Sequence, residues 1–216
     1  MLKAMLWDND GVLVDTEKLY FEACRDELAA QGIEINEADF VATFLKTSEG
    51  IKAFVGHLDE AEFAALRTRR NERYSALLQR GVEPITGVRE TLAALHGKVR
   101  MGIVTSCRGD HFEMIHASTG LLSYFEFVLV REDYEASKPE PEPYLVAMER
   151  NGLAADQCLV VEDSERGLQA AVAAGLRCVV IPQGLTEQSD FSRAFAVLND
   201  INELAPLVFA LILEDA

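Results

Sequence analysis

Residues 7–16 read Trp7-Asp8-Asn9-Asp10-Gly11-Val12-Leu13-Val14-Asp15-Thr16, and they continue a short apolar run, Ala4–Trp7. That run is too short for a helix and is typical of a buried parallel strand, so two aspartates lie where the strand ends. Two carboxylates this close repel each other, and a bound cation or protonation relieves the repulsion. The alternative interpretation is a turn at Asp10-Gly11. We interpret Asp8 and Asp10 as a cation-dependent pair, and we expect Asp15 to cap a helix beginning near Thr16.

Downstream of this stretch, short apolar runs alternate with longer helical patterns. Strict alternation of strand and helix predicts an α/β fold with a doubly wound, Rossmann-like parallel sheet. Gly152 and Gly175 fall where two of the helices should end. The predicted strands are Ala4–Trp7, Val99–Val104, Phe125–Val130, Cys158–Val161, Cys178–Ile181 and a weaker Phe195–Leu198, and the predicted helices are Val88–Leu95, Asp110–Thr119, Glu142–Asn151 and Glu165–Ala174.

Residues 16–82 break the alternation because they contain no convincing strand. The stretch has helical signals instead: a shared face of Tyr20, Cys24 and Leu28 closed by Gly32, a cap residue at Asn36, and a capping box at Asp59 and Glu62. We therefore predict a core domain from residues 1–15 and 83–216, with 16–82 inserted as a helical cap domain. Such a cap would lie over the carboxyl ends of the strands, where ligands bind in this class of fold.

A second acidic group, Glu162-Asp163-Ser164, follows another predicted strand. By itself this group could be a helix start, because Asp163 or Ser164 would cap a helix from Glu165. Parallel strands all end at the same edge of the sheet, so these carboxylates can converge with Asp8 and Asp10. Carboxylates, a backbone carbonyl and water form the oxygen shell that Mg²⁺ prefers.

Two further polar groups follow the remaining strands. Thr105 comes directly after Gly102-Ile103-Val104, where its hydroxyl and the amide of Ser106 could hold a phosphoryl oxygen. Lys138 opens Lys138-Pro139-Glu140-Pro141, and the prolines stiffen the loop that presents it. A lone Lys is normally a solvated surface residue, but a site with this many carboxylates needs a nearby cation.

Together these groups resemble the haloacid dehalogenase-like hydrolase superfamily in its phosphatase branch, over nearly the whole chain. Four motifs in order carry the resemblance: Asp8-x-Asp10-Gly11-Val12-Leu13-x-Asp15-Thr16, then Thr105, then Lys138-Pro139-x-Pro141, and finally Glu162-Asp163-Ser164-x-x-Gly167 with Ala170-Ala171-x-x-Ala174-Gly175.

The resemblance implies a mechanism. Asp8 attacks phosphorus and forms an aspartyl-phosphate, and Asp10 is the general acid and base. Mg²⁺ is held by Asp8, the Asp10 carbonyl and Asp163, with Glu162 as an additional ligand, and Mg²⁺ and Lys138 neutralise the anionic phosphate. Ser106 and Arg108 lie beside the phosphate and, with the cap, set the specificity. Asn9 departs from the family pattern, which is usually apolar there, and we expect its side chain to point away from the site.

Several related activities compete with phosphatase. Haloacid dehalogenases and phosphonate hydrolases lack an Asp at the Asp10 position. The β-phosphoglucomutases carry a His five residues beyond the motif's last Asp, where this chain has Tyr20, and a cap Arg where it reads Lys46-Thr47-Ser48-Glu49-Gly50; Lys46 could bind an anion in its place. A receiver-like phospho-acceptor domain needs no helical insert. Hydrolysis of a small phosphate monoester is therefore the favoured function and a sugar-phosphate mutase the alternative.

The composition limits the classes of binding partner to be expected. The formal net charge of −16 disfavours a nucleic-acid partner but leaves a small phosphorylated metabolite possible. The four cysteines are dispersed, as expected of reduced thiols in a cytoplasmic protein. The N-terminus does not resemble a signal peptide, and the apolar run Leu207–Leu213 is too short to span a membrane. No pattern indicates the oligomeric state.

Overall fold

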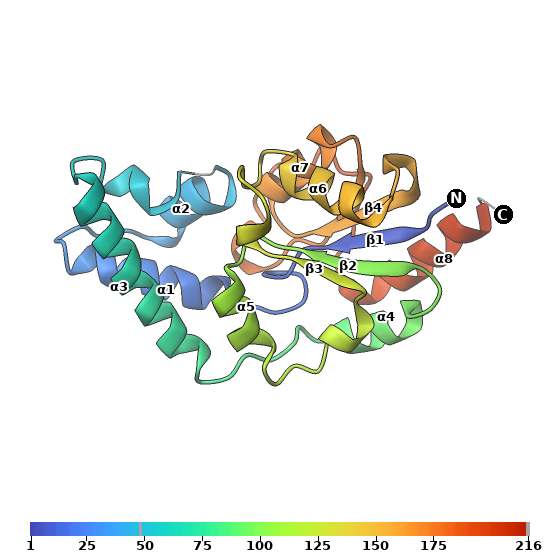
Figure 1. Cartoon of the computed structure of the whole chain (residues 1–216), viewed down its shortest axis with the longest axis horizontal. Helices are drawn as coiled ribbons and strands as arrows, with labels where there is room; N and C mark the ends of the chain where they lie inside the picture. The colour runs from blue at the N-terminus through green and yellow to red at the C-terminus, as the bar shows by residue number, and fades with distance from the viewer. Residues whose placement is uncertain (48, 215–216) are drawn as a thin grey trace.

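The computed structural model describes residues 1–47 and 49–214, and at its centre lies a six-stranded parallel sheet (Figure 1). The strand order is β3-β2-β1-β4-β5-β6, so the strand that carries the two motif aspartates is central. The strands are β1 (Ala4–Trp7), β2 (Arg100–Val104), β3 (Phe127–Leu129), β4 (Cys158–Glu162), β5 (Arg177–Val180) and β6 (Ala196–Val197). The predicted doubly wound fold is confirmed.

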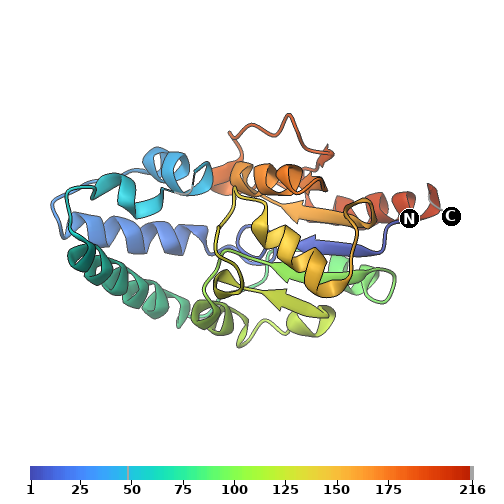
Figure 2. The same ribbon diagram turned by 45° about the horizontal axis from the view of Figure 1, so that its top comes forward.

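Side chains alternate between the two faces of the sheet and bury both, which is why the strands read as continuous apolar runs. Trp7 and Ile103 belong to a core beneath α4 (Val88–Leu95), α5 (Gly109–His116) and α8 (Leu204–Glu214). Leu6 and Val104 belong to the opposite core beneath α6 (Glu142–Asn151) and α7 (Glu165–Ala173). Figure 2 shows α6 and α7 in front of the sheet and α4 and α8 behind it.

The predicted crossover helices are confirmed to within a few residues, and one helix was missed. Helix α8 contains the run Leu207–Leu213 that we noted only as apolar, and its Pro206 occupies the first turn, where a missing N–H costs little. Its sequence is apolar on nearly all sides and so shows no amphipathic period. Among the described residues, no helix combines the length and apolar character needed to cross a membrane.

Residues 17–78 form a helical lobe beside the carboxyl ends of the strands (Figure 1). Its elements are α1 (Glu17–Ala29), α2 (Glu37–Phe40), a π-helix (Val41–Leu45), a 3-10 helix (Gly50–Phe54) and α3 (Glu60–Leu78). The predicted cap residues Asn36 and Asp59 each form a capping box. The prediction for Asp15 was wrong: Thr16 is the N-cap of α1 and makes no side-chain cap bond, because its hydroxyl is directed to Asp10. Ser48 lies outside the described residues.

The two long helices of the lobe are joined by a buried charge. The Glu27 carboxylate on α1 is 1% exposed and accepts hydrogen bonds from Arg69 at 2.7 Å and Arg73 at 3.0 Å, both on α3. Its neighbour Asp26 pairs with Arg25 at 2.8 Å on the exposed face of the same helix. Because Glu27 is buried, breaking its ion pairs with the two arginines is costly. The Arg25–Asp26 pair is exposed to solvent and contributes almost nothing to the free energy of unfolding.

We predict that Glu27→Gln lowers the free energy of unfolding by about 2 kcal/mol, because two charge-assisted hydrogen bonds are lost while both arginines keep access to water. The matched control Asp26→Asn should change it by less than about 0.5 kcal/mol. Urea denaturation of the three proteins measures both values. Equal effects of the two substitutions would contradict this account of the α1–α3 contact.

Candidate active site

The carboxyl ends of β1, β2 and β4 bring the predicted site residues together. Asp8 follows β1, Thr105 follows β2, and Asp163 follows Glu162 at the end of β4. One carboxylate oxygen from each of Asp8, Glu162 and Asp163 lies within 4.8 Å of the others. The parallel register of β1 with both β2 and β4 produces this convergence, because neighbouring strands end at the same level.

Lys138 supplies the cation that this cluster needs. It lies between β3 and α6 and is 1% exposed. Its ammonium group donates to Asp8 Oδ1 at 3.0 Å, Glu162 Oε1 at 2.6 Å and the Val104 carbonyl at 2.9 Å, which uses all three of its protons. The Tyr144 ring lies 5.0 Å away beneath it. The two carboxylates raise the pKa of Lys138 although burial lowers it, so the side chain is charged.

A single lysine does not balance the carboxylates around it. Burial, and then the charge of Glu162, raise the pKa of Asp8 to about 7 although Lys138 lowers it. Burial and the charge of Glu17 raise the pKa of Asp163 well above its usual value. Protons are therefore bound here near neutral pH unless another cation takes their place.

Asp163 has the features of a metal ligand. It is 1% exposed, and among the described residues its Oδ2 atom has no hydrogen-bond partner. Gly11 adopts φ +78°, and a Cβ atom there would overlap the Asp163 carboxylate, so a side chain at this position would fill the site. A buried, unpartnered carboxylate oxygen beside Asp8 fits a hard divalent cation such as Mg²⁺.

Glu162 lies in the same cluster, but its oxygens have protein partners. Oε1 accepts from Lys138 and, at 2.6 Å, from the Tyr144 hydroxyl, and Oε2 accepts from the Ser164 hydroxyl at 3.3 Å. A Cβ atom at Gly167 would overlap this carboxylate, which explains the glycine one turn into α7. Ser164 is also the N-cap of α7, as predicted. These contacts favour Glu162 as the partner that holds Lys138.

Asp10 is held by three side chains at the edge of the cluster. Thr16 donates to Oδ1, the Asn9 amide donates to Oδ2 at 3.3 Å, and the Thr105 hydroxyl lies 3.5 Å from Oδ2. The expectation that the Asn9 side chain points away from the site was therefore incomplete. Its carbonyl does face away, towards His116, but its amide contacts Asp10 because one planar group can serve both directions.

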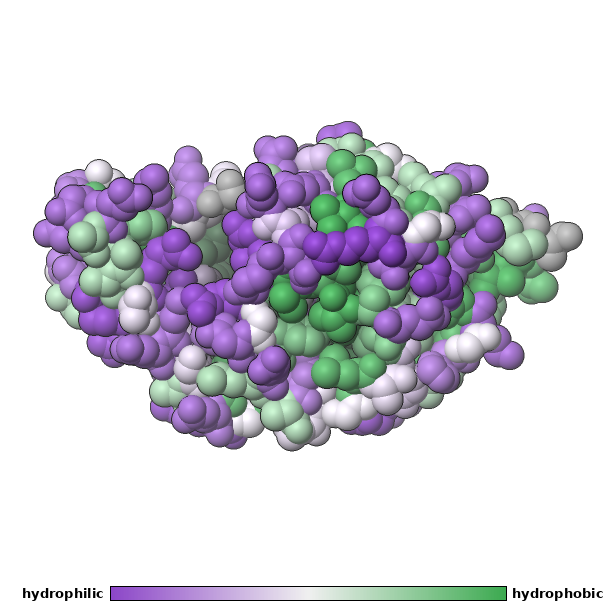
Figure 3. Space-filling model, viewed as in Figure 1, coloured by the Kyte–Doolittle hydropathy of each residue, from purple (hydrophilic) through white to green (hydrophobic). Residues whose placement is uncertain are grey.

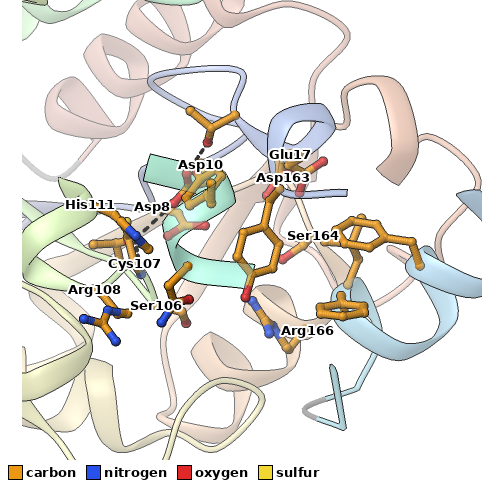
Figure 4. A pocket seen from close by; sticks show the side chains of 18 of the residues that line it. Asp8, Asp10, Glu17, Ser106, Cys107, Arg108, His111, Asp163, Ser164 and Arg166 are labelled. Atoms are coloured by element: carbon orange, nitrogen blue, oxygen red, sulfur yellow. Dashed lines mark hydrogen bonds between the residues drawn. The ribbon is translucent and has the colours of Figure 1, made fainter. Parts of the chain in front are cut away.

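Thr105, Ser106 and Arg108 lie on one side of the cavity. Thr105 is fully buried, and its hydroxyl accepts from the Cys107 amide at 3.0 Å, which orients it. Arg108 lies at the rim and pairs with Asp110 at 2.8 Å, so this charge is shared with a neighbouring carboxylate. Figure 4 shows Asp8, Asp10, Glu17 and Asp163 in the upper part of the pocket, with Arg108 and Arg166 below them.

The helical lobe contributes the opposite wall, whose members apart from Tyr20 were not predicted as site residues from the sequence. Arg70 on α3 is 6% exposed and donates to the Tyr20 hydroxyl on α1, and the two groups lie in cation–π contact at 4.7 Å. Tyr20 was indicated by its helical spacing and by its match to the mutase His position. Its contact with Arg70 has no sequence signal, because α1 and α3 are distant in sequence and meet only in the fold. The wall consists of Glu17, Tyr20, Phe40, Phe44, Leu45, Arg70, Asn71 and Tyr74. Beyond it, the lobe surface in Figure 3 is mostly hydrophilic.

This geometry is shared with a known protein family. A family model described as haloacid dehalogenase-like hydrolase matches residues 5–181, which run from the second residue of β1 past the end of β5 and include the motif residues Asp8, Thr105, Lys138 and Asp163. The chain belongs to this family. The resemblance inferred from the four motifs is confirmed, and with it the assignment of the chain as an enzyme of a hydrolase family.

Relatives with established names match along most of the chain. Protein CbbY of Rhodobacter capsulatus is 31% identical over 218 residues, covering 94% of this chain and 96% of its own. Fructose-1-phosphate phosphatase YqaB of Escherichia coli is 29% identical over 177 residues, covering 81% and 94%. The crystal structure of CbbY from Rhodobacter sphaeroides in complex with phosphate superposes with a TM-score of 0.82 at 26% identity, covering 94% and 96%.

The unpartnered Asp163 oxygen predicts stabilisation by Mg²⁺. At a concentration of about 100 times its dissociation constant, Mg²⁺ should raise the free energy of unfolding by about 2.7 kcal/mol. The effect should be smaller at pH 6 than at pH 8, because protons bound by Asp8, whose pKa is raised to about 7, compete with the cation. Thermal denaturation with and without a chelator measures this difference.

Without Mg²⁺, the stability of the protein should fall as the pH rises. The site carboxylates have raised pKa values in the folded protein, so the folded protein holds protons that the unfolded chain releases. This stabilisation is lost as the pH rises through about 7. Asp163→Asn should abolish the Mg²⁺ effect, and Asp156→Asn, an exposed aspartate before β4, should leave it intact. A Mg²⁺ effect that survives Asp163→Asn would contradict this placement of the cation.

Proposed function

We propose that the protein hydrolyses a small phosphate monoester through an aspartyl-phosphate on Asp8, with Mg²⁺ as its cofactor. The observation that carries this proposal is the environment of Asp8. One of its oxygens is held by the buried Lys138 ammonium, and its carboxylate lies beside that of Asp163, whose Oδ2 atom has no hydrogen-bond partner among the described residues. A carboxylate fixed in this way can act as a nucleophile towards an anion once the charge around it is neutralised.

The steps follow from the residues around Asp8. An Asp8 oxygen attacks phosphorus while the bond to the ester oxygen breaks, and Asp10 donates its proton to that leaving oxygen. Asp10, now ionised, takes a proton from water, whose oxygen attacks the same phosphorus and releases phosphate and the Asp8 carboxylate. Lys138 offsets negative charge in both steps, and the Thr105 hydroxyl and Ser106 amide orient a phosphoryl oxygen.

Mg²⁺ fits this site because the available donors are hard oxygens and one of them lacks a partner. We propose Asp8, Asp163 and the Asp10 carbonyl as its protein ligands. Glu162 is not among them, because its carboxylate binds Lys138. Bound there, Mg²⁺ would supply charge neutralisation for the approaching phosphate.

The position of Tyr20 disfavours the mutase alternative. The β-phosphoglucomutases carry a His at this position of the first cap helix. Burial raises the pKa of Tyr20 to about 12, and its hydroxyl already accepts a hydrogen bond from Arg70. Lys46, which could have replaced the mutase's anion-binding Arg, pairs with Glu165 at 3.7 Å and does not line the cavity. Hydrolysis is therefore the better supported reaction.

The cavity limits the substrate to a small molecule. Its volume is about 180 Å³, and its walls combine the carboxylate cluster with aromatic rings and with Arg70, Arg108 and Arg166. We propose that residues 16–82 act as a cap domain that closes this cavity over a phosphorylated metabolite such as a sugar phosphate. Two relatives support this class. YqaB is named a fructose-1-phosphate phosphatase, and a mutant of CbbY from Rhodobacter sphaeroides was crystallised in complex with xylulose-(1,5)bisphosphate.

Substitutions of the two motif aspartates should have different effects on the rate. Asp8→Asn should abolish turnover of p-nitrophenyl phosphate, because no nucleophile remains. Asp10→Asn should lower kcat by about 10²- to 10⁴-fold on an ester with a poor leaving group, because acid and base assistance is lost while the metal and Asp8 stay in place. Steady-state release of phosphate in Mg²⁺ measures both rates.

Asp15→Asn is the matched control, since Asp15 belongs to the same stretch of sequence but its side chain is exposed. It should keep kcat within about twofold of the wild-type value. Near-normal turnover by Asp8→Asn would refute the proposed nucleophile, and near-normal turnover of a poor leaving group by Asp10→Asn would refute only the acid–base role.

A further inference from the structure

Asn9, between the two motif aspartates, links the site to a buried histidine. Its side chain is fully buried. The Oδ1 atom lies 2.7 Å from His116 Nε2, and Nδ2 lies 3.3 Å from Asp10 Oδ2. His116, at the end of α5, reaches Thr119 Oγ1 through Nδ1 at 2.9 Å. Four side chains from two distant parts of the sequence, Asn9 and Asp10 in one and His116 and Thr119 in the other, therefore form one continuous chain of hydrogen bonds that ends on Asp10.

The direction of this chain is fixed by chemistry. The Asp10 carboxylate only accepts, so the Asn9 amide faces it and the Asn9 carbonyl faces His116. His116 Nε2 must then carry a proton. Burial lowers the pKa of His116 to about 4, so the ring is neutral and Nδ1 accepts from the Thr119 hydroxyl. Thr119 Oγ1 in turn accepts from the Leu121 amide at 3.4 Å. Every donor points towards Asp10, and aligned bonds of this kind strengthen one another.

The chain of hydrogen bonds occupies one Asp10 oxygen and leaves the other available for proton transfer. Oδ2 is contacted by Asn9 and faces Thr105, whereas Oδ1 is contacted by the hydroxyl of Thr16, the N-cap of α1. A hydroxyl rotates freely about its C–O bond, so Thr16 can release Oδ1 to a leaving oxygen. The Asn9 amide cannot rotate without breaking its bond to His116. Asp10 is thereby anchored through one oxygen and available through the other.

We propose that Asn9 is a positioning residue for Asp10, itself oriented by His116 and Thr119. The inference rests on the proposed function, because it assumes that Asp10 protonates the leaving group. In that step the phosphorus–oxygen bond breaks, the proton passes from Asp10 to the leaving oxygen, and Asp10 remains as a carboxylate. The Asn9 N–H stabilises this carboxylate and holds it in line with the ester.

A purely structural role is the competing explanation. His116 is buried and needs a partner for its N–H, and Asn9 could serve only that need. The two explanations differ in one respect. A structural role ties any loss of activity to a loss of stability, whereas a positioning role selectively slows esters whose leaving group needs a proton.

The test compares first-turnover release of the phenol from phenyl phosphate and from p-nitrophenyl phosphate, with enzyme in excess and Mg²⁺ present. The two esters are similar in size, but the nitro group makes proton donation nearly unnecessary. Asn9→Leu should slow phenol release about tenfold and nitrophenol release less than about threefold, with half-saturating concentrations within about twofold of the wild-type values.

Three further variants separate position from stability. Asn9→Leu/His116→Leu removes both polar partners, so its melting temperature should recover while phenol release stays slow. His116→Gln keeps a donor for the Asn9 carbonyl and should retain phenol release within about threefold. Thr91→Val, which removes a buried hydroxyl bonded to the Ile201 carbonyl at 3.3 Å, controls for stability loss alone and should keep both rates.

An unchanged ratio of the two rates in Asn9→Leu would overturn the inference and leave the proposed function standing. Recovery of phenol release together with stability in the double variant would also overturn it, in favour of a structural role. If the wild-type protein released neither phenol nor p-nitrophenol, the proposed function would be overturned, and this inference with it.

Discussion

The structure depends on one electrostatic constraint: four carboxylates converge at the carboxyl edge of a parallel sheet, and a single buried ammonium group faces them. Strand polarity produces the convergence, because Asp8 and Asp10 follow β1, while Glu162 ends the neighbouring β4 and Asp163 follows it. Lys138 satisfies Asp8 and Glu162 with two of its three protons. Asp163 keeps an unpartnered oxygen, and that imbalance is what a divalent cation would relieve. The remaining features of the site serve this arrangement.

Two glycines show how closely the backbone is adapted to these charges. Gly11 and Gly167 lie where a Cβ atom would overlap Asp163 and Glu162. Each carboxylate thus packs directly against main chain, out of contact with water. The helical lobe completes the enclosure from the other side, where the Tyr20 hydroxyl accepts a hydrogen bond from Arg70 and burial raises the pKa of Tyr20 to about 12. Burial in this enclosure is the largest cause of the raised pKa of Asp8.

The strands and the residues at their ends could be predicted from the sequence for physical reasons. The same reasons explain which contacts and which helix could not. Strands buried on both faces read as apolar runs, and residues at their ends are brought together by topology, so Asp8, Thr105 and Asp163 could be placed from the sequence alone. Contacts that depend on two helices meeting in space, such as Arg70 with Tyr20, leave no periodic signal. Helix α8 was missed because it is apolar all round. Asn9 was misjudged because a strand-alternation argument assigns the side chain one direction, whereas an amide has two functional ends.

The central claim is that the Asp8 carboxylate becomes covalently bonded to phosphorus. The most direct measurement is to quench a turnover in acid within the first milliseconds, reduce the protein with borohydride, and analyse its peptides by mass spectrometry. Borohydride converts an acyl phosphate, but not a free carboxylate, to an alcohol. This account predicts homoserine in place of Asp8 and an unmodified Asp10 in the same peptide. Reduction at another residue, or an unmodified peptide while product is released at the full rate, would contradict it.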